Sequence, residues 1–406
     1  MRASRSSAPA DPIVAAVHPD PHGYYAGLRE RSLHRDDPTG LWVASSAATV
    51  TAALSHPAAR VRPPREPVPE PLVGSPAGRL FERLVRTTDG QSMKASIVDA
   101  LDGCAGASLH ERADAWAARL GADRGRGDPA SSLVDLVFAL PVHVTADLLG
   151  IPAAQQERVI RCVPDFARCL APAGAVERAA ANHAAERLGS LVRACLDSAP
   201  RGSLLGRLES HARGAGVDAD GVVANAIGLL CQARDATAAL IASTLVTLAR
   251  RPALAGRIRR EPEALAAIIE EVARFEAPVQ NTRRFLHQPV ALEGVNVPAG
   301  ECILVLLAAA NRDPAVNPEP DVFDPDRGHP RLFTFGMGPH ACPGRRLAVV
   351  ITSAIVSRLL ARGPDLRRLE RQPRYRPSPN LRMPDLVWAG RDLEMRRVGP
   401  ERGGAR

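Results

Sequence analysis

Residues 335–344 read FGMGPHACPG and run directly into RRLAVVITSAIVSRLLARG at 345–363. The first stretch is too rich in glycine and proline for a helix, whereas the second has helical apolar spacing. Cys342 therefore lies in a tight loop at a helix N-terminus, where backbone N–H groups and the helix dipole stabilise an anionic sulfur. This pattern predicts a nucleophile, a redox sensor or a single metal ligand. An ordinary buried cysteine would not account for the three glycines and two prolines around it.

The composition of the 406 residues narrows the class of protein. Hydrophobic residues make up 45% and charged residues 24%, which excludes a disordered or collagen-like chain. No stretch approaches the roughly 20 uninterrupted apolar residues of a membrane helix, and the N-terminus lacks the apolar region of a secretory signal. We therefore expect a cytoplasmic protein without membrane contact, whose seven cysteines stay reduced. None of them forms a C-x-x-C pair, which argues against a zinc or dithiol motif.

The net charge of +8 comes almost entirely from arginine, because Lys94 is the single lysine. The arginines are spread along the chain and only 3% of residues are aromatic. A nucleic-acid-binding surface would need a basic stripe with interleaved aromatic residues, so no nucleic acid partner is expected. The charge fits solvated helix faces or an acidic protein partner.

Most of the chain has a helical pattern. Alanine-rich stretches with apolar residues three and four apart predict helices over 108–121, 132–149, 174–197, 218–250 and 263–276. The 218–250 helix is the longest and is expected to be central. Strands are predicted at 41–44 and, with a turn at Gly294, within 290–306, and a hairpin at 386–395. Residues 57–78, crowded with proline, predict a surface loop, and 311–330 predict coil. The predicted fold class is mainly α with small β-sheets (α+β).

Three segments together resemble one family, the cytochrome P-450 superfamily. Its F-x-x-G-x-x-x-C-x-G haem-binding loop is matched by Phe335, Gly338, His340, Cys342 and Gly344. Its E-x-x-R helix is matched by Glu271 and Arg274 in EEVARFEAPVQ, and the meander before the loop is similar to NRDPAVNPEPDVFDPDR at 311–327. Residues 20–45 look like the N-terminal region of soluble bacterial members.

The resemblance implies a single-domain haem protein with the long helix lying over the haem. Residues 21–398 would form the haem domain, between a flexible N-terminal segment 1–20 and a flexible tail 399–406. The Cys342 thiolate would bind the iron of haem b, Phe335 would shield the sulfur from water, and Gly338 and Gly344 would allow close approach. It also implies that Glu271, Arg274 and Arg327 form a buried triad that supports the loop. Without the resemblance, the first two would read as a surface i,i+3 bridge.

The family resemblance implies only some of the residues that would bind the haem propionates. His340 and Arg284 take the family positions that bind the haem propionates. The H-x-x-x-R pattern that supplies a third partner is absent, because TDGQSMKASIVDAL at 88–101 places Met93 and Ile97 in those positions. Lys94 is the candidate to compensate.

The long helix departs from the family pattern A-G-x-[Asp/Glu]-Thr, since it reads Ala233-Arg234-Asp235-Ala236-Thr237. The resemblance makes Thr237 a proton-relay residue and places Ala233 over the haem. Asp235 lies one residue, or about 100° of helix rotation, from the usual acid position. It is either catalytic or paired with an arginine outside the pocket. Arg234 either reaches into the distal pocket, toward an anionic substrate or a propionate, or extends to solvent.

The implied function is oxidation of a small organic substrate with dioxygen, in a natural-product pathway and as a monomer. Electrons would pass from NAD(P)H through a reductase and an acidic ferredoxin docked near Arg345 and Arg346. The altered helix leaves open an atypical coupling, cyclisation or peroxide-driven reaction, and also a haem-binding protein without activity. A cysteine hydrolase with a Cys342–His340 dyad is disfavoured, because residues i and i+2 of such a loop suit haem wrapping better.

Overall fold

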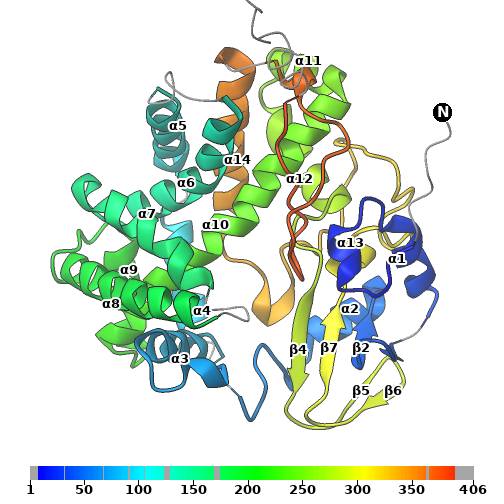
Figure 1. Ribbon diagram of the computed structural model, residues 1–406, viewed down its shortest axis with the longest axis horizontal. Helices are drawn as coiled ribbons and strands as arrows, with labels where there is room; N and C mark the ends of the chain where they lie inside the picture. Colours follow the sequence, from blue (N-terminus) through cyan, green and yellow to red (C-terminus); the bar gives the residue numbers. More distant parts are fainter. Residues whose placement is uncertain are drawn as a thin grey trace, which may run out of the picture.

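Helices dominate the structure, and short strands form two small sheets at one side (Figure 1). This computed structural model describes residues 8–31, 33–66, 68–89, 92–104, 106–122, 129–168, 174–362 and 365–388. The helices are α1 (His22–Arg29), α2 (Ala47–Ser55), α3 (Pro76–Asp89), α4 (Ser92–Asp102), α5 (Ala107–Ala122), α6 (Pro129–Leu149), α7 (Ala153–Arg168), α8 (Ala175–Asp197), α9 (Leu204–Gly214), α10 (Ala219–Arg250), α11 (Pro252–Arg260), α12 (Ala264–Phe275), α13 (Leu307–Asn311) and α14 (Arg345–Arg362). The predicted α+β class is confirmed.

The larger sheet has the strand order β1-β2-β7-β4-β3. Its strands are β1 (His34–Asp36), β2 (Leu41–Ala44), β3 (Ala59–Arg60), β4 (Thr282–Leu286) and β7 (Cys302–Val305). Strands β2 and β7 are parallel, and the other neighbours are antiparallel. The second sheet is the hairpin of β5 (Val290–Leu292) and β6 (Val295–Val297). Glu293 and Gly294 both have positive φ, as a two-residue hairpin turn requires, which confirms the predicted turn.

The predicted central helix is α10, which packs against α6, α14, α3, α8 and α12. The Asp218 side chain caps it by accepting a hydrogen bond from the Gly221 N–H at 2.8 Å. Residues 237–249 are buried on every side. Among the described helices, α10 alone is long and apolar enough to span a membrane. Its neighbours cover most of it, so it is the core helix of this fold.

Eight of the described helices were not predicted from periodicity, namely α1, α2, α3, α4, α7, α9, α11 and α13. Helix α2 is short, α7 contains Pro164, and α3 begins at Pro76, inside the stretch predicted as a loop. The prediction of a loop for 57–78 is therefore too long at its end, and it also missed β3. Most of the hairpin predicted at 386–395 lies outside the described residues. Within them, Trp388 forms an isolated bridge with Leu369.

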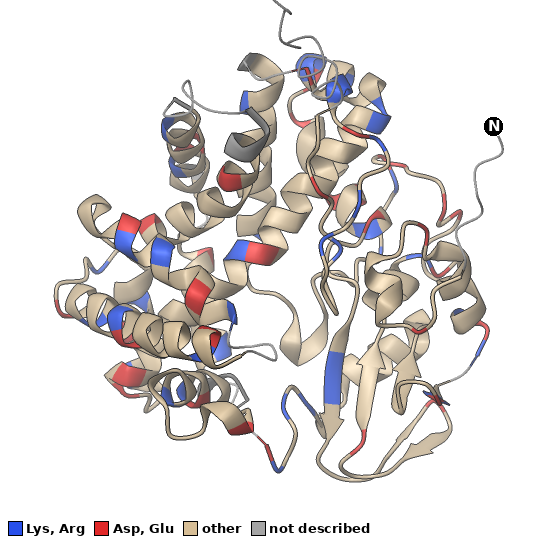
Figure 2. Ribbon diagram, viewed as in Figure 1, with Lys and Arg blue, Asp and Glu red and all other residues tan. Residues whose placement is uncertain are grey.

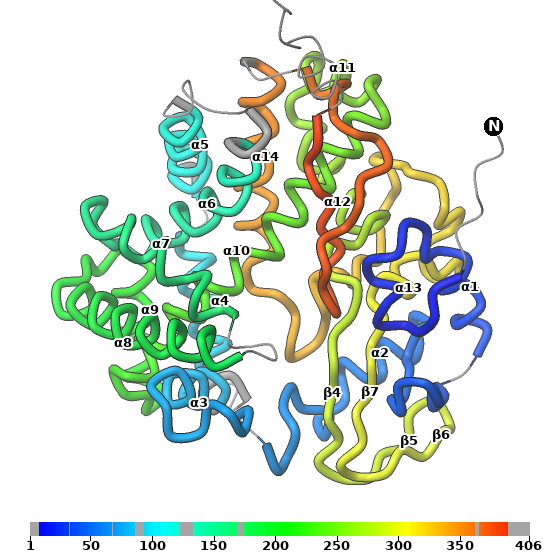
Figure 3. Tube along the Cα trace, in the orientation of Figure 1, coloured from blue at the N-terminus to red at the C-terminus, as the bar shows by residue number. Residues whose placement is uncertain are grey.

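The predicted flexible segment 1–20 is packed on the fold where the structure describes it. Ala15 and Ala16 are fully buried. The buried Arg382 guanidinium donates to the carbonyls of His18 at 2.5 Å and Pro19 at 3.0 Å. Figure 3 shows the C-terminal segment that carries Arg382 lying beside α12. Local composition does not reveal this tertiary contact, and the predicted domain boundary at residue 20 stays a prediction. Residues 1–7 and the predicted tail 399–406 lie outside the described residues.

Candidate functional site

The cysteine loop holds Cys342 between a 3-10 turn, Gly338–His340, and the first turn of α14. The Cys342 N–H donates to the Phe335 carbonyl at 2.7 Å, which closes the loop. The Cys342 side chain is exposed to solvent at the surface of the protein. Desolvation by the surrounding protein raises the pKa of its thiol, while the Gly344 N–H and the charge of Lys94 lower it. The sulfur thus has one backbone donor and one nearby cation to stabilise its anionic form.

Two glycines give this loop its shape. Gly338 has φ +62°, and a Cβ there would lie 3.1 Å from Ser55 Oγ of α2. Gly336 has φ +64°, and its Cβ would lie 3.0 Å from the His340 carbonyl oxygen. Both positions therefore require glycine for backbone conformation and for space. Gly344 differs, because its Cβ would meet Cys342 Sγ at an ordinary 3.8 Å. The predicted close approach to the sulfur is thus made by the backbone of Gly344, whereas Gly338 packs against α2.

A group of cations surrounds the loop. Burial, together with the nearby charges of Arg284, Lys94 and Arg60, lowers the pKa of His340 to about 4. Burial also lowers the pKa of Lys94 to about 8, with Cys342 opposing this change and Arg284 adding to it. Among the described residues, no carboxylate contributes to either shift. The surroundings of Cys342 are therefore electropositive and suit an anionic ligand.

Glu271 and Arg274 of α12 form the most deeply buried ion pair in the described part of the chain. The Arg274 Nε and Nη2 atoms donate to the two Glu271 carboxylate oxygens, each at 2.7 Å. The remaining N–H groups of Arg274 donate to three carbonyls, those of Asn311, Pro320 and Val322. All five guanidinium donors are thereby used. The pair is not a surface bridge.

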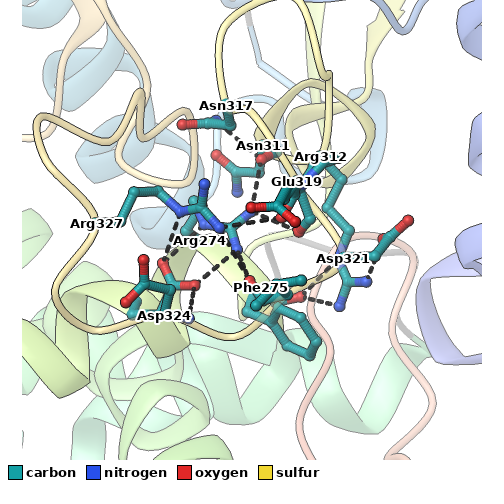
Figure 4. Close-up of polar contacts among 12 residues, drawn as sticks. Arg274, Phe275, Asn311, Arg312, Asn317, Glu319, Asp321, Asp324 and Arg327 are labelled. Atoms are coloured by element: carbon teal, nitrogen blue, oxygen red, sulfur yellow. Dashed lines mark hydrogen bonds and ion pairs between the residues drawn. The ribbon is translucent and has the colours of Figure 1, made fainter.

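Arg327 joins this pair from the coil that follows α13 (Figure 4). Its Nε lies 4.0 Å from Glu271 Oε2, and it also donates to the carbonyls of Pro318, Glu319 and Val322. Glu271 Oε1 accepts a further hydrogen bond from the Asp324 N–H at 2.9 Å. The structure therefore brings the three predicted triad residues together, and their contacts fasten the predicted coil 311–330 to α12.

Comparisons with known proteins agree with this geometry. A family model described as Cytochrome P450 matches residues 176–362. The 20-oxo-5-O-mycaminosyltylactone 23-monooxygenase of Streptomyces fradiae is 30% identical over 242 residues, which cover 60% of this chain and 57% of that protein. The crystal structure of CalO2 superposes with a TM-score of 0.76 at 25% identity, covering 93% of this chain and 97% of that one. This chain has the cytochrome P450 fold, and its residues 176–362 match the cytochrome P450 family.

Further relatives carry the same family name. Putative cytochrome P450 133B2 of Xylella fastidiosa is 32% identical over 246 residues, or 58% of this chain and 62% of the relative. The matched sequence thus spans a little over half the length of these relatives, whereas the structural likeness extends over nearly the whole P450 fold.

The central helix of this P450 fold changes character between Cys231 and Thr237. Residues 232–236 are partly or fully exposed, although the helix is buried on both sides of them. Ala233 and Ala236 lie in this stretch, and Thr237 is buried at its end. This part of α10 is therefore the least covered stretch of the helix interior. Thr237 is the first buried residue after it, and its relay role stays a prediction.

Arg234 and Asp235 are engaged with protein partners. Arg234 Nη1 forms an ion pair with Asp235 Oδ1, and its guanidinium lies 4.4 Å from the ring centroid of Phe138 in α6. The Arg234 guanidinium therefore contacts the Asp235 carboxylate and the face of the Phe138 ring. Of the two alternatives for Asp235, pairing with an arginine is the one observed. The prediction that Arg234 reaches an anionic substrate or a propionate has no support in these contacts, because α6 supplies a stacking partner that lies 96 positions away in sequence.

The haem edge fits an anionic group although its usual pattern is missing. Met93 is fully buried and Ile97 packs against the core, so neither provides a polar partner. Lys94 instead lies near enough to Arg284 and Cys342 for each to shift its pKa. Arg284 is a buried arginine of β4 that donates to the Arg283 carbonyl at 2.8 Å. Cationic groups without a described carboxylate suit the two propionates of haem, and an accessible thiol suits its iron. The residues present fit haem b.

Sequence reasoning missed several parts of the support. The Asn311 side chain accepts a hydrogen bond from the Phe333 N–H at 2.6 Å and donates one to Thr334 Oγ1 at 2.7 Å. These two bonds fix the segment that leads to the cysteine loop. Asn317 bonds to the Arg331 backbone in both directions, at 2.9 and 3.0 Å. Two asparagines in a proline-rich coil were the available signal, because such side chains satisfy backbone groups that lack regular structure.

Proposed function

We propose that this chain is a haem-thiolate monooxygenase that oxidises a small organic molecule. The observation that carries the proposal is the position of Cys342 Sγ, which is accessible, lies near the charge of Lys94 and is stabilised by the Gly344 N–H just before α14. When bound, haem b supplies the redox chemistry by which dioxygen is split and one oxygen atom is inserted.

The chain's own residues would then hold the haem, shield the Cys342 sulfur from water and pass a proton. Cys342 would bind the iron, and Arg284, His340 and Lys94 would bind the propionates. Phe335, whose ring lies 5.7 Å from the Arg345 guanidinium, would exclude water from the sulfur. Thr237 would hold and pass a proton at its Oγ1.

Electrons would come from NAD(P)H through a reductase and an acidic ferredoxin. Arg346 is exposed at the start of α14 and has no ion pair among the described residues, which favours this face for docking. Arg345 is less available, because its Nη2 pairs with Glu270 Oε1 at 2.7 Å. A natural-product substrate is supported by the Streptomyces relative, whose name specifies a substituted tylactone. We place the protein in the cytoplasm, as a monomer.

The spectrum of the purified protein tests the proposal. The reduced carbonyl complex should show the strongly red-shifted Soret band of thiolate ligation, and Cys342→Ala should abolish it. Cys302→Ala is a matched control, since burial raises the pKa of the Cys302 thiol to about 11 on β7. If the band survives in Cys342→Ala, or disappears only in another cysteine variant, the iron ligand is not Cys342.

A second candidate is a peroxide-driven or coupling reaction on the same haem. It is favoured by the helix sequence, in which Ala236 fills the acid position and Asp235 is paired with Arg234. Product formation with hydrogen peroxide and without ferredoxin would support it. Activity that requires NAD(P)H and ferredoxin would support the monooxygenase, and haem binding without turnover under either condition would support the non-catalytic alternative.

A further inference from the structure

Helices α7 and α8 pack against each other on the side of the molecule away from the sheets (Figure 1). Residues of both helices line a groove. Two adjoining hollows form it, with volumes of about 470 and 280 Å³, and His183 and Arg187 line both. The groove shares no residue with the Cys342 site. Its larger hollow is within the range of small-molecule sites.

Both helices contribute basic residues to this groove, and Figure 2 shows Lys and Arg positions along α7 and α8. Arg158 and Arg161 lie one turn apart on α7, and His183 and Arg187 lie one turn apart on α8. Two acidic residues also line the groove. Asp165 is at the larger hollow but pairs with Arg168 at 3.2 Å, and the exposed Glu186 lies at the smaller hollow, where the arginines and His183 outnumber it. Within the described residues, no ion pair is formed by Arg158, Arg161 or Arg187. These three guanidiniums are available to an external anion.

The floor of the groove is apolar. Cys162 and Ala184 line it and are buried, and Leu191 lies partly buried under the smaller hollow. Burial raises the pKa of the Cys162 thiol, while the charges of Arg187 and Arg161 lower it. Both guanidiniums therefore lie beside the apolar floor. A ligand here meets apolar surface below and positive charge at the rim.

We infer that the α7–α8 groove binds an amphiphilic anion, with a carboxylate or phosphate head among Arg158, Arg161 and Arg187 and an apolar body on the floor. Guanidinium groups bind both heads through paired, charge-assisted hydrogen bonds. The three arginines are exposed to solvent, which weakens each contact, so the expected dissociation constant is micromolar to millimolar. Because α8 also packs on α3 and α10, an occupied groove would hold these helices together.

Calorimetric titration of the holoprotein with octyl phosphate and with octanoate tests this inference. One or both should bind at least tenfold more tightly than inorganic phosphate, and neutral octanol should not bind at the groove. Whichever head binds more tightly identifies the preferred source of the charge. Recording the haem absorbance in the same titration separates the groove from the Cys342 site, because groove binding should leave that spectrum unchanged.

The double variant Arg161→Gln/Arg187→Gln should weaken binding about tenfold or more. The control Arg213→Gln/Arg367→Gln removes the same charge from exposed arginines elsewhere, paired with Glu209 and Asp365, and should stay within twofold of wild type. If both double variants lose the same amount of affinity, the effect comes from overall charge rather than from the groove, and the inference is overturned. It would also fail if no heat is detected at millimolar probe, or if binding shifts the haem spectrum and ignores the groove variants. A failure to find thiolate ligation would leave this test intact, since the binding heat does not depend on the iron ligand.

Discussion

Replacing Arg274 by alanine should remove most of the stability of the haem-binding region. Its guanidinium is fully buried and donates five hydrogen bonds, two to Glu271 and one to each of three carbonyls. In Arg274→Ala the Glu271 carboxylate would keep only the Asp324 N–H at 2.9 Å and Arg327 at 4.0 Å. Removing one partner of a buried ion pair costs about 3–5 kcal/mol. Because a whole domain is stable by only about 5–15 kcal/mol, we expect little folded, haem-loaded protein.

Two further variants separate charge, geometry and exposure. Arg274→Lys keeps the positive charge but offers three donors without the planar fork, so its loss of stability should be intermediate. Arg213→Ala is the matched control, since Arg213 forms an exposed intrahelical pair with Glu209 at 2.6 Å. Such i,i+4 pairs contribute about 0.5 kcal/mol or less.

The assay combines urea unfolding, followed by far-ultraviolet circular dichroism, with Soret absorbance per mole of protein. The order of stability should be wild type and Arg213→Ala, then Arg274→Lys, then Arg274→Ala. If Arg274→Ala unfolds within about 1 kcal/mol of wild type and carries full haem, the pair does not support the site and the burial argument is wrong.

Three other outcomes are expected. Burial and four nearby arginines lower the pKa of His22 to about 2, so the unfolded chain alone binds this proton as pH falls from 6.5 toward 2, and stability falls with it. His22→Phe, which keeps the ring contact with Phe275, should flatten the pH dependence by up to about 1.4 kcal/mol per pH unit in urea titrations, and equal slopes would contradict this. Ferredoxin-supported reduction, measured by stopped flow, should slow as the salt concentration rises. Arg346→Gln should reduce both the rate and its salt dependence more than Arg345→Gln, because Arg345 is paired with Glu270. Reduction rates that do not change with ionic strength would exclude this docking face. Ala236→Asp should raise the amount of product formed per NAD(P)H consumed, because it supplies a general acid beside Thr237. Arg234→Gly should leave substrate affinity within about twofold of wild type, because the Arg234 guanidinium already contacts Phe138 and Asp235. An unchanged ratio of product to NAD(P)H, or a large loss of affinity, would contradict these two assignments.

Local sequence determined the parts of this protein whose chemistry depends on neighbours in the chain. The glycines and prolines around Cys342 specify a tight loop before a helix, because positive φ and the absence of an N–H are properties of single residues. The spacing of Glu271 and Arg274 places them on one face of α12 for the same local reason. The long apolar pattern of 218–250 likewise predicts a buried helix, since no amphipathic face remains for solvent.

Tertiary structure alone decided where the charged side chains find partners. Neither Arg234 nor Phe138 carries a signal that the two will stack, and nothing in 8–20 indicates that Arg382 will bind its carbonyls. The same holds for the cations around Cys342, which come from α4, β3 and β4. A long side chain pairs with whatever group the packing of distant elements brings within a few ångströms, and that distance is set by the whole fold rather than by spacing along the chain.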